Sequence, residues 1–169
     1  MKARKNLKTK TAIIQCAVPH LSSSKYPIAY ITITVFSHAT EDPEKVQTAV
    51  RNTLPEALAA DVTFTKNEVT GHYGNPIVFY EAKLADRPAL LGVLEKFAQD
   101  LSSLDKETFH EELKQHIEKH NLYLRFSKQN AYLGTLKLAT NDPIHFKIHF
   151  KNKTPEQIME LCRKAGLLP

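Results

Sequence analysis

The stretch IHFKIHF, residues 144–150, alternates hydrophobic and polar side chains without interruption. Side chains two positions apart on a β-strand point to the same face of a sheet. The stretch therefore predicts a strand with a buried hydrophobic face and an exposed basic face, the latter carrying His145, Lys147 and His149. A sheet of this kind needs a layer of helices over its hydrophobic face, which favours an α+β fold.

Two segments before this stretch share its alternation, namely LYLRF at residues 122–126 and GTLKLA at residues 134–139. The sequence NDP at 141–143 is typical of a turn, so we expect the three segments to form a meander of neighbouring strands. Their polar faces would then make one exposed basic patch. It comprises Tyr123, Arg125, Lys137, His145, Lys147 and His149, with Lys128, Gln129 and Tyr132 at its rim.

The predicted patch combines cations with aromatic rings. Such groups contact phosphates and stack on unpaired bases in RNA complexes. A solvated sheet face, on which long basic side chains discourage edge pairing, would show the same sequence pattern. Both interpretations stay open at this point.

The rest of the chain supplies the remaining strands and the helices. We expect strands at 28–36, 61–69 and 76–84, the last two joined as a hairpin, and helices at 42–54, from 86 to about 101 and from about 105 to 120. A capping box of Thr154 and Gln157 predicts a final helix that ends at Gly166. The predicted order is β-α-β-β-α-α-β-β-β-α, a largely antiparallel sheet with helices packed on one face.

Composition and charge limit the class of protein. The 169 residues carry a formal net charge of +5, with 42% hydrophobic and 24% charged residues, which predicts a folded protein and favours a polyanionic partner. Two cysteines far apart in the sequence predict no disulfide framework and a reducing, cytoplasmic location. Residues 1–25 begin with a basic run and lack the apolar length of a signal or membrane span. We therefore predict a mobile N-terminal segment over 1–25 and a single domain over 26–169.

The sequence TGHYGN, residues 70–75, places two glycines three positions apart. KH domains clamp a nucleic-acid backbone with this GxxG spacing, but a KH loop joins helices and this turn joins predicted strands. We interpret it as a hairpin turn that holds RNA by placing His72, Tyr73 and Asn75 beside the basic patch. The alternative is a purely structural turn, because glycine permits positive φ.

Motifs for metal binding or catalysis are incomplete. His116 and His120 lie four residues apart on a predicted helix, but the glutamate of the zinc protease motif is missing. The sequence also lacks a nucleophile elbow, a P-loop and a dinucleotide-binding fingerprint. We therefore predict no catalytic residues, no metal site and no cofactor.

Three segments together carry a family resemblance: GHYGNPI at 71–77, LRFSKQ at 124–129 and AYLG at 131–134. They resemble an archaeal family of predicted RNA-binding proteins, formerly a domain of unknown function and often described as prospective exosome-associated subunits. The resemblance spans about residues 27–166. It implies an α+β fold like that of large-subunit ribosomal protein five, and it implies RNA binding. Ser127 departs from the family pattern, in which we expect an acidic residue.

The leading hypothesis is a non-catalytic RNA-binding protein that acts as an accessory factor in RNA processing or degradation and grips phosphates with the basic sheet face. The alternative is a protein-interaction adaptor within an RNA-processing complex, docked through His110, His116 and His120. A nuclease or RNA-modifying enzyme is the third hypothesis. Expected partners are RNA and subunits of such a complex, with no membrane. The candidate RNA-binding residues are Arg125, Lys128, Gln129, Lys137, Lys147, His72, Tyr73, Asn75, Tyr123 and Tyr132.

Overall fold

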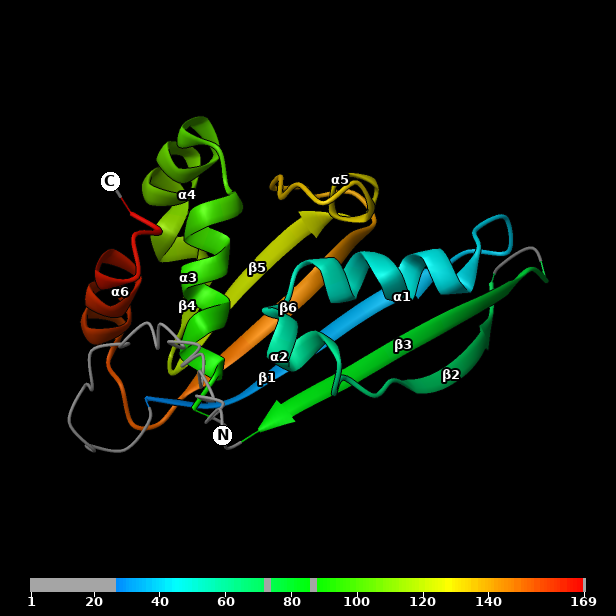
Figure 1. Cartoon of the computed structure of the whole chain (residues 1–169), viewed down its shortest axis with the longest axis horizontal. Coiled ribbons are helices and arrows are strands. Elements are labelled where there is room, and N and C mark those ends of the chain that lie inside the picture. Colours follow the sequence, from blue (N-terminus) through cyan, green and yellow to red (C-terminus); the bar gives the residue numbers. More distant parts are fainter. Residues whose placement is uncertain (1–26, 72–73, 86–87, 169) are drawn as a thin grey trace, which may run out of the picture.

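The framework of the molecule is a six-stranded sheet in the order β2-β3-β1-β6-β5-β4, seen in a computed structural model that describes residues 27–71, 74–85 and 88–168 (Figure 1). Every pair of neighbouring strands is antiparallel. The strands are β1 (Ile28–Ser37), β2 (Thr65–Thr70), β3 (Pro76–Ala85), β4 (Ile117–Glu118), β5 (Asn121–Ser127) and β6 (Pro143–Phe150). The predicted α+β class with an antiparallel sheet is confirmed.

The helices cover one face of this sheet. They are α1 (Pro43–Asn52), α2 (Glu56–Ala59), α3 (Leu90–Asp100), α4 (Ser103–His116), α5 (Lys128–Tyr132) and α6 (Pro155–Lys164). Figure 1 shows α1, α2 and α3 lying across the sheet, with α4 and α6 beside the end that carries β4. No helix in the described part of the chain covers the opposite face, and none there is long and apolar enough to cross a membrane.

Aromatic packing joins the helical layer to the sheet. The ring of Phe97 on α3 lies 4.8 Å from that of Phe126 on β5 and 5.1 Å from that of Phe146 on β6, both edge to face. Edge-to-face pairs of this kind are stabilising beyond the area that they bury. The hydrophobic side chains of β6 are fully buried as its alternation predicts, and the polar side chains stay partly exposed.

The final helix also forms as predicted. The side chain of Thr154 accepts a hydrogen bond from the backbone N–H of Gln157, and the Gln157 side chain accepts one from the backbone N–H of Thr154. The two bonds satisfy backbone donors that a helix start leaves unpaired. Gly166 follows the helix with a φ of 82°, a conformation that favours glycine.

Two predictions about the second half of the chain are wrong. The helix expected over 105–120 ends at His116, because β4 and a turn with Lys119 at a φ of 53° follow. The segment 134–139 does not lie between β5 and β6, which pair directly. It runs along the other side of β5, where the N–H of Ser127 donates to the Lys137 carbonyl at 2.9 Å. The unpredicted helix α5 carries the chain to that side.

Candidate nucleic-acid interface

The uncovered side of the sheet, here called the open face, is formed by alternate residues of four strands. Register places Thr32 of β1 between Lys83 of β3 and Lys147 of β6, and Lys147 opposite Tyr123 of β5. Cations on non-neighbouring strands thus lie in one row across the sheet. The open face comprises Tyr30, Thr32, Thr34, Phe36, Phe79, Glu81, Lys83, Tyr123, Arg125, His145, Lys147 and His149.

Rings and cations pack against one another on this face. Tyr30 stacks on His149 with ring centroids 4.7 Å apart, and the Lys83 ammonium group lies 4.5 Å from the Tyr30 ring centroid. Tyr123 lies nearly parallel to His145 at 5.7 Å. Contacts between a cation and an aromatic ring are favourable. The face is therefore ordered before any ligand arrives.

Arg125 stands out among these cations. Its side chain is exposed, and no hydrogen bond or ion pair joins it to another residue within 27–71, 74–85 or 88–168. An unpaired guanidinium offers five donors in a planar fork that matches phosphate oxygens. Arg125 is therefore free to bind an anion.

The two histidines beside these cations are held towards the neutral form. Burial lowers the pKa of His145, and the charges of Arg125 and Lys147 lower it further. Burial, His120 and Lys147 act in the same direction on the pKa of His149. A ligand with negative charge would reverse this effect, because it stabilises the imidazolium form.

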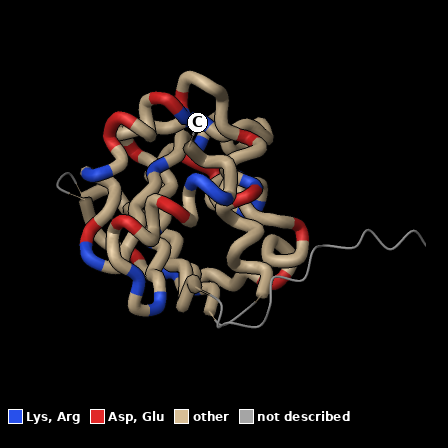
Figure 2. The backbone as a smooth tube through the Cα atoms, turned by 90° about the vertical axis from the view of Figure 1, so that its left-hand side faces the viewer, with Lys and Arg blue, Asp and Glu red and all other residues tan. Residues whose placement is uncertain are grey.

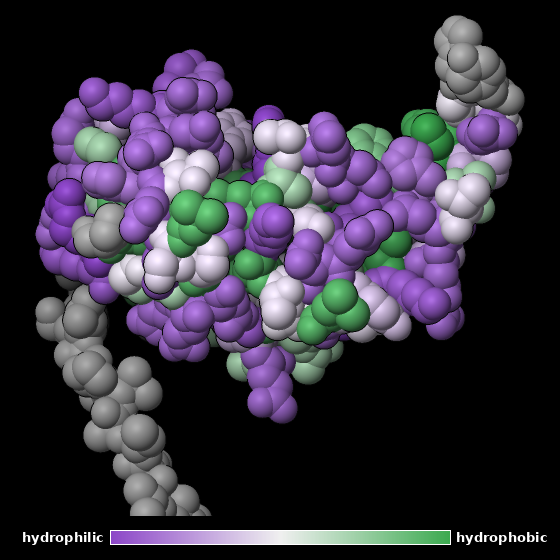
Figure 3. Space-filling view, turned by 90° about the horizontal axis from the view of Figure 1, so that it is seen from above, coloured by the Kyte–Doolittle hydropathy of each residue, from purple (hydrophilic) through white to green (hydrophobic). Residues whose placement is uncertain are grey.

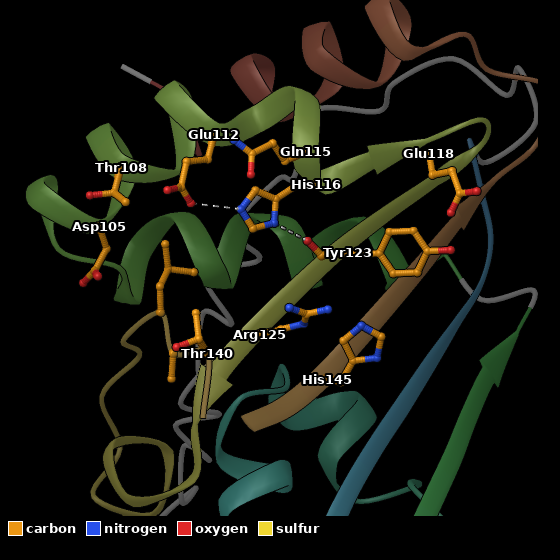
Figure 4. Close-up of a pocket in the computed structure, with 12 residues that line it drawn as sticks. Asp105, Thr108, Glu112, Gln115, His116, Glu118, Tyr123, Arg125, Thr140 and His145 are labelled. Carbon is orange, nitrogen blue, oxygen red and sulfur yellow. Dashed lines mark hydrogen bonds and ion pairs between the residues drawn. The ribbon is translucent and has the colours of Figure 1, made fainter. Parts of the chain in front are cut away.

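A groove of about 820 Å³ lies where α4 rises beside the open face, here called the α4 groove (Figure 4). Figure 4 shows Arg125 near its centre, Glu112 and Thr108 on the helical wall, and Tyr123 and His145 on the sheet. The groove thus continues the open face. Its lining residues are Asp105, Thr108, Glu112, Gln115, His116, Glu118, Tyr123, Arg125, Leu138, Ala139, Thr140 and His145.

His116 fixes the helical wall of the α4 groove relative to the sheet. Its Nδ1–H donates to the Tyr123 carbonyl at 2.8 Å, and its Nε2 lies 3.8 Å from a carboxylate oxygen of Glu112. Its ring also packs on Phe109, with centroids 5.1 Å apart. A side chain held from three directions loses little further freedom when a ligand binds, so the groove is preorganised.

Comparison with known proteins assigns the family. Residues 30–150 match a family model described as RNA binding. This protein belongs to that RNA-binding family. RNA-binding protein PAB1135 from Pyrococcus abyssi is 38% identical to it over 124 residues, which are 72% of this chain and 80% of that protein.

Two further relatives extend the similarity. Uncharacterized protein MJ0213 from Methanocaldococcus jannaschii is 27% identical over 143 residues, 78% of this chain and 93% of that one. The solved structure of Mth689, a DUF54 protein from Methanothermobacter thermautotrophicus, superposes with a TM-score of 0.68 at 31% identity, covering 83% of this chain and 98% of that one. The fold of that DUF54 protein therefore covers most of this chain.

The structure divides the predicted RNA-binding residues of this family member into separate groups. Tyr123, Arg125 and Lys147 do lie together on the open face. Lys137 is exposed on the segment beside β5. Gln129 and Tyr132 lie instead on α5, where they line a hollow of about 340 Å³ against α1. The observed basic surface is therefore smaller than the patch predicted from the sequence, because Gln129 and Tyr132 lie on α5 and not on the open face.

Lys128 is not at the rim of an exposed patch, so that prediction is wrong. Its side chain is only 8% exposed. Its ammonium group lies 2.7 Å from a carboxylate oxygen of Glu41 and 2.5 Å from one of Asp142, and donates to the Phe36 carbonyl at 2.9 Å. All three ammonium donors therefore have partners inside the protein.

These groups form what we call the Lys128 cluster: Lys128, Glu41, Asp142, His38 and the Phe36 carbonyl. His38, Glu41 and Asp142 are close enough to share a metal ion. The Lys128 ammonium group already places a positive charge between the two carboxylates. The cluster links the loop after β1 to both ends of the 128–142 connection, which is a structural role.

The glycine turn lies apart from the basic residues. It joins β2 to β3 as predicted, with Thr70 opposite Pro76 and the Gly71 N–H donating to the Asn75 carbonyl at 2.8 Å. Asn75 lies six residues along β3 from the row that contains Arg125, and three strands across, a separation of about 25 Å at ordinary strand spacing. The predicted placement of Asn75 beside the patch is therefore wrong, and His72 and Tyr73 lie outside the described residues.

Sequence reasoning missed two parts of the interface. Lys83 and Tyr30 belong to the open face because β1 lies between β3 and β6. The alternation of residues in β3 could have indicated that Lys83 faces away from the core. The acidic residues that line the α4 groove, Asp105 and Glu112 on α4 and Glu118 on β4, were also missed. No spacing in the sequence indicates that α4 faces β5.

His116 and His120, the pair weighed for metal binding from the sequence, bond to different partners. His116 donates to Tyr123 and His120 donates to the Lys153 carbonyl at 2.7 Å, so the two histidines do not share a helix face. Burial raises the pKa of the Cys162 thiol to about 12, which keeps it protonated. A protonated buried thiol is a poor nucleophile.

The three histidines considered as a docking surface do not lie on one helix. His110 is exposed, His116 is partly buried in the α4 groove, and His120 lies beyond the helix. Figure 2 shows cationic and anionic residues interspersed at the end of the molecule where α6 lies. Figure 3 shows hydrophobic side chains as small separate patches in a largely hydrophilic surface. On the face seen in Figure 3, these patches are smaller than the broad apolar surface that marks a stable protein interface.

Proposed function

We propose that this protein binds RNA through the open face and catalyses no reaction on it. The observation that carries the proposal is the row of cations from Lys83 to Lys147, extended by the unpaired Arg125. Lys83 and Arg125 are exposed and Lys147 is half-buried, and register places the carboxylates of Glu81 and Glu118 on the same side of the sheet. Because phosphates dominate affinity for nucleic acids, such a surface attracts a polyanion.

Family membership supports RNA as the polyanion. The matching family model is described as RNA binding, and the relative from Pyrococcus abyssi is named an RNA-binding protein. The residues matched, 30–150, include every strand pair that builds the open face. We infer an accessory role in RNA processing or degradation, in which this protein holds RNA for other subunits.

The aromatic residues of the open face serve this function chiefly by ordering it. The ring of Tyr30 lies between His149 on β6 and the Lys83 ammonium group on β3, so both sides of the ring have neighbours. Stacking of a base there would require those neighbours to move. Tyr123 has its ring partners on β6, and its other side borders the α4 groove. Tyr123 is therefore the open-face tyrosine best placed to contact a base.

The test compares two triple variants with equal charge. One replaces Lys83, Arg125 and Lys147 with Gln, and the matched control replaces Lys45, Arg163 and Lys164, which are exposed on α1 and α6. Binding to single-stranded RNA is measured across a salt series. The slope of log affinity against log salt should fall by about two in the open-face variant, at roughly 0.7 per lost phosphate contact. Equal slopes in the two variants would refute the open face as the RNA surface.

A further inference from the structure

The α4 groove has a charge distribution that phosphates alone do not explain. Its sheet side carries Arg125, and its helical side carries the carboxylates of Asp105 and Glu112. Carboxylates accept hydrogen bonds and repel phosphates, so the helical wall suits a donor group. A nucleotide has both kinds of group, because its phosphate is an anion and the edge of its base can donate.

Glu112 is the carboxylate best placed for this role. It lies on the wall facing Arg125, and its side chain is about half exposed, at 54%. Its contact with His116 Nε2 is long, at 3.8 Å, which leaves its oxygens available. Asp105 differs, because its carboxylate already accepts a hydrogen bond from the Ser102 hydroxyl at 2.6 Å.

We propose, on the basis of the RNA-binding function above, that the α4 groove receives one unpaired guanine base of an RNA strand held on the open face. The Glu112 carboxylate accepts from N1–H and N2–H of the guanine. The base borders Tyr123, and Arg125, which lies near the centre of the groove, binds a phosphate that flanks the base. Recognition of this kind reads the Watson–Crick edge of a base outside a helix.

The pairing selects guanine because of its neighbouring donors. Guanine presents two adjacent N–H groups that match the two oxygens of a carboxylate. Adenine and cytosine each place an acceptor nitrogen next to their amino group, and uracil places carbonyls on both sides of its N–H. Each of these bases would bring a lone pair towards the carboxylate and lose affinity, since opposing acceptors are costly when partly desolvated.

The groove also has the size and rigidity for such a site. Its volume, about 820 Å³, lies within the range of small-molecule pockets. His116 holds the wall near Glu112 by its bond to the Tyr123 carbonyl, so wall and floor keep their separation. An RNA strand on the open face can reach the groove directly. Tyr123, Arg125 and His145 belong to both surfaces.

The experiment uses fluorescent six-nucleotide oligouridine RNA with one central guanosine, inosine or adenosine, and measures binding at low salt. Wild-type protein should bind the guanosine RNA about tenfold more tightly than the adenosine RNA, as expected for a bidentate pair. Inosine, which lacks the N2 amino group, should fall between them. Glu112→Gln should reduce the guanosine preference to less than about threefold, through weaker binding of the guanosine RNA.

Glu111→Gln is the matched control, because Glu111 is the exposed neighbour on α4 and does not line the groove. It should keep the tenfold preference. Equal binding of guanosine and adenosine RNA by the wild type would overturn the guanine inference and leave the proposed function standing. A preference that survives in Glu112→Gln would also overturn it. Absence of binding to every RNA at low salt would refute the proposed function itself.

Discussion

The Lys128 cluster and the region around Arg125 are opposites, although the two cations are three residues apart in the sequence. Lys128 is 8% exposed and makes three close contacts with oxygen atoms. Arg125 is exposed on the open face and has no ion pair within the described part of the chain. Both look alike in the sequence as cations within a basic stretch. Their partners decide that one stabilises the fold and the other is free to bind a ligand.

The comparison shows why counting cations overestimates a binding surface. The oxygen atoms around Lys128 come from the end of β1, from the loop after it and from the turn before β6, which meet only in the folded chain. A buried ammonium group needs such partners, because burying an unpaired charge is costly. Arg125 points from β5 into a groove open to solvent, so its charge stays hydrated and no burial cost arises. A free cation is thus identified from its surroundings.

The largest effect expected from this difference is on stability at Lys128. Lys128→Met should lower the free energy of unfolding by about 2 kcal/mol, because two carboxylates and the Phe36 carbonyl lose their donor. Denaturant unfolding measures the change. The RNA affinity of the folded variant should equal that of the wild type. A stability loss below about 0.5 kcal/mol would show that the cluster is not structural.

The second effect concerns Arg125, whose replacement should weaken RNA binding and leave the stability of the fold nearly unchanged. Arg125→Met should weaken RNA binding by about fivefold, or about 1 kcal/mol, because a charge-assisted contact is lost. Its free energy of unfolding should change by less than about 0.5 kcal/mol, as is usual for exposed sites. Binding titrations and denaturant curves on the same preparation check both values. An unchanged RNA affinity in this variant would contradict the claim that Arg125, unlike Lys128, binds RNA.

The smallest effect concerns pH and the two open-face histidines. The pKa values of His145 and His149 are lowered in the folded state, so the unfolded chain binds these protons more readily. Their contribution to stability is therefore present above pH ~6.5 and is lost as the pH falls through the folded-state pKa values. RNA phosphates favour the imidazolium form, so RNA affinity should rise over the same fall in pH.

Variants separate these histidines from the other titrating groups. His145→Asn combined with His149→Asn should flatten both pH profiles, while His110→Asn, on the exposed surface of α4, should leave them unchanged. Thermal unfolding and RNA titrations from pH 5 to about 7.5 give the two profiles. An affinity that falls on acidification would contradict the placement of phosphates beside these histidines.

The parts predicted from sequence are those that depend on neighbouring residues. Alternation fixes which side chains of β5 and β6 are buried, and the capping box of Thr154 fixes the start of α6. Predicting the open face also requires the order of the strands. Lys83 and Lys147 share a row only because β1 lies between β3 and β6. Strand order of this kind depends on contacts far apart in sequence.

The candidate site shows the same limit. The burial of Lys128 depends on Glu41, which is 87 residues earlier in the chain. The α4 groove depends on a helix that ends at His116 and turns back through β4, and the periodicity of residues 105–120 gave no sign of that end. Local patterns could therefore predict strands and cations, but not which cations remain free or which acids face them.

The most direct test of the account is a backbone amide NMR titration of the protein with single-stranded RNA that contains one guanosine. We predict that the amide signals of β5, β6 and β1 shift, with the largest changes near Tyr123, Arg125 and Lys147, and that those of α1 and α6 stay in place. Shifts confined to α1, α5 or α6 would contradict the central claim, because RNA would then bind on the helical side and the open face would be only a solvated surface.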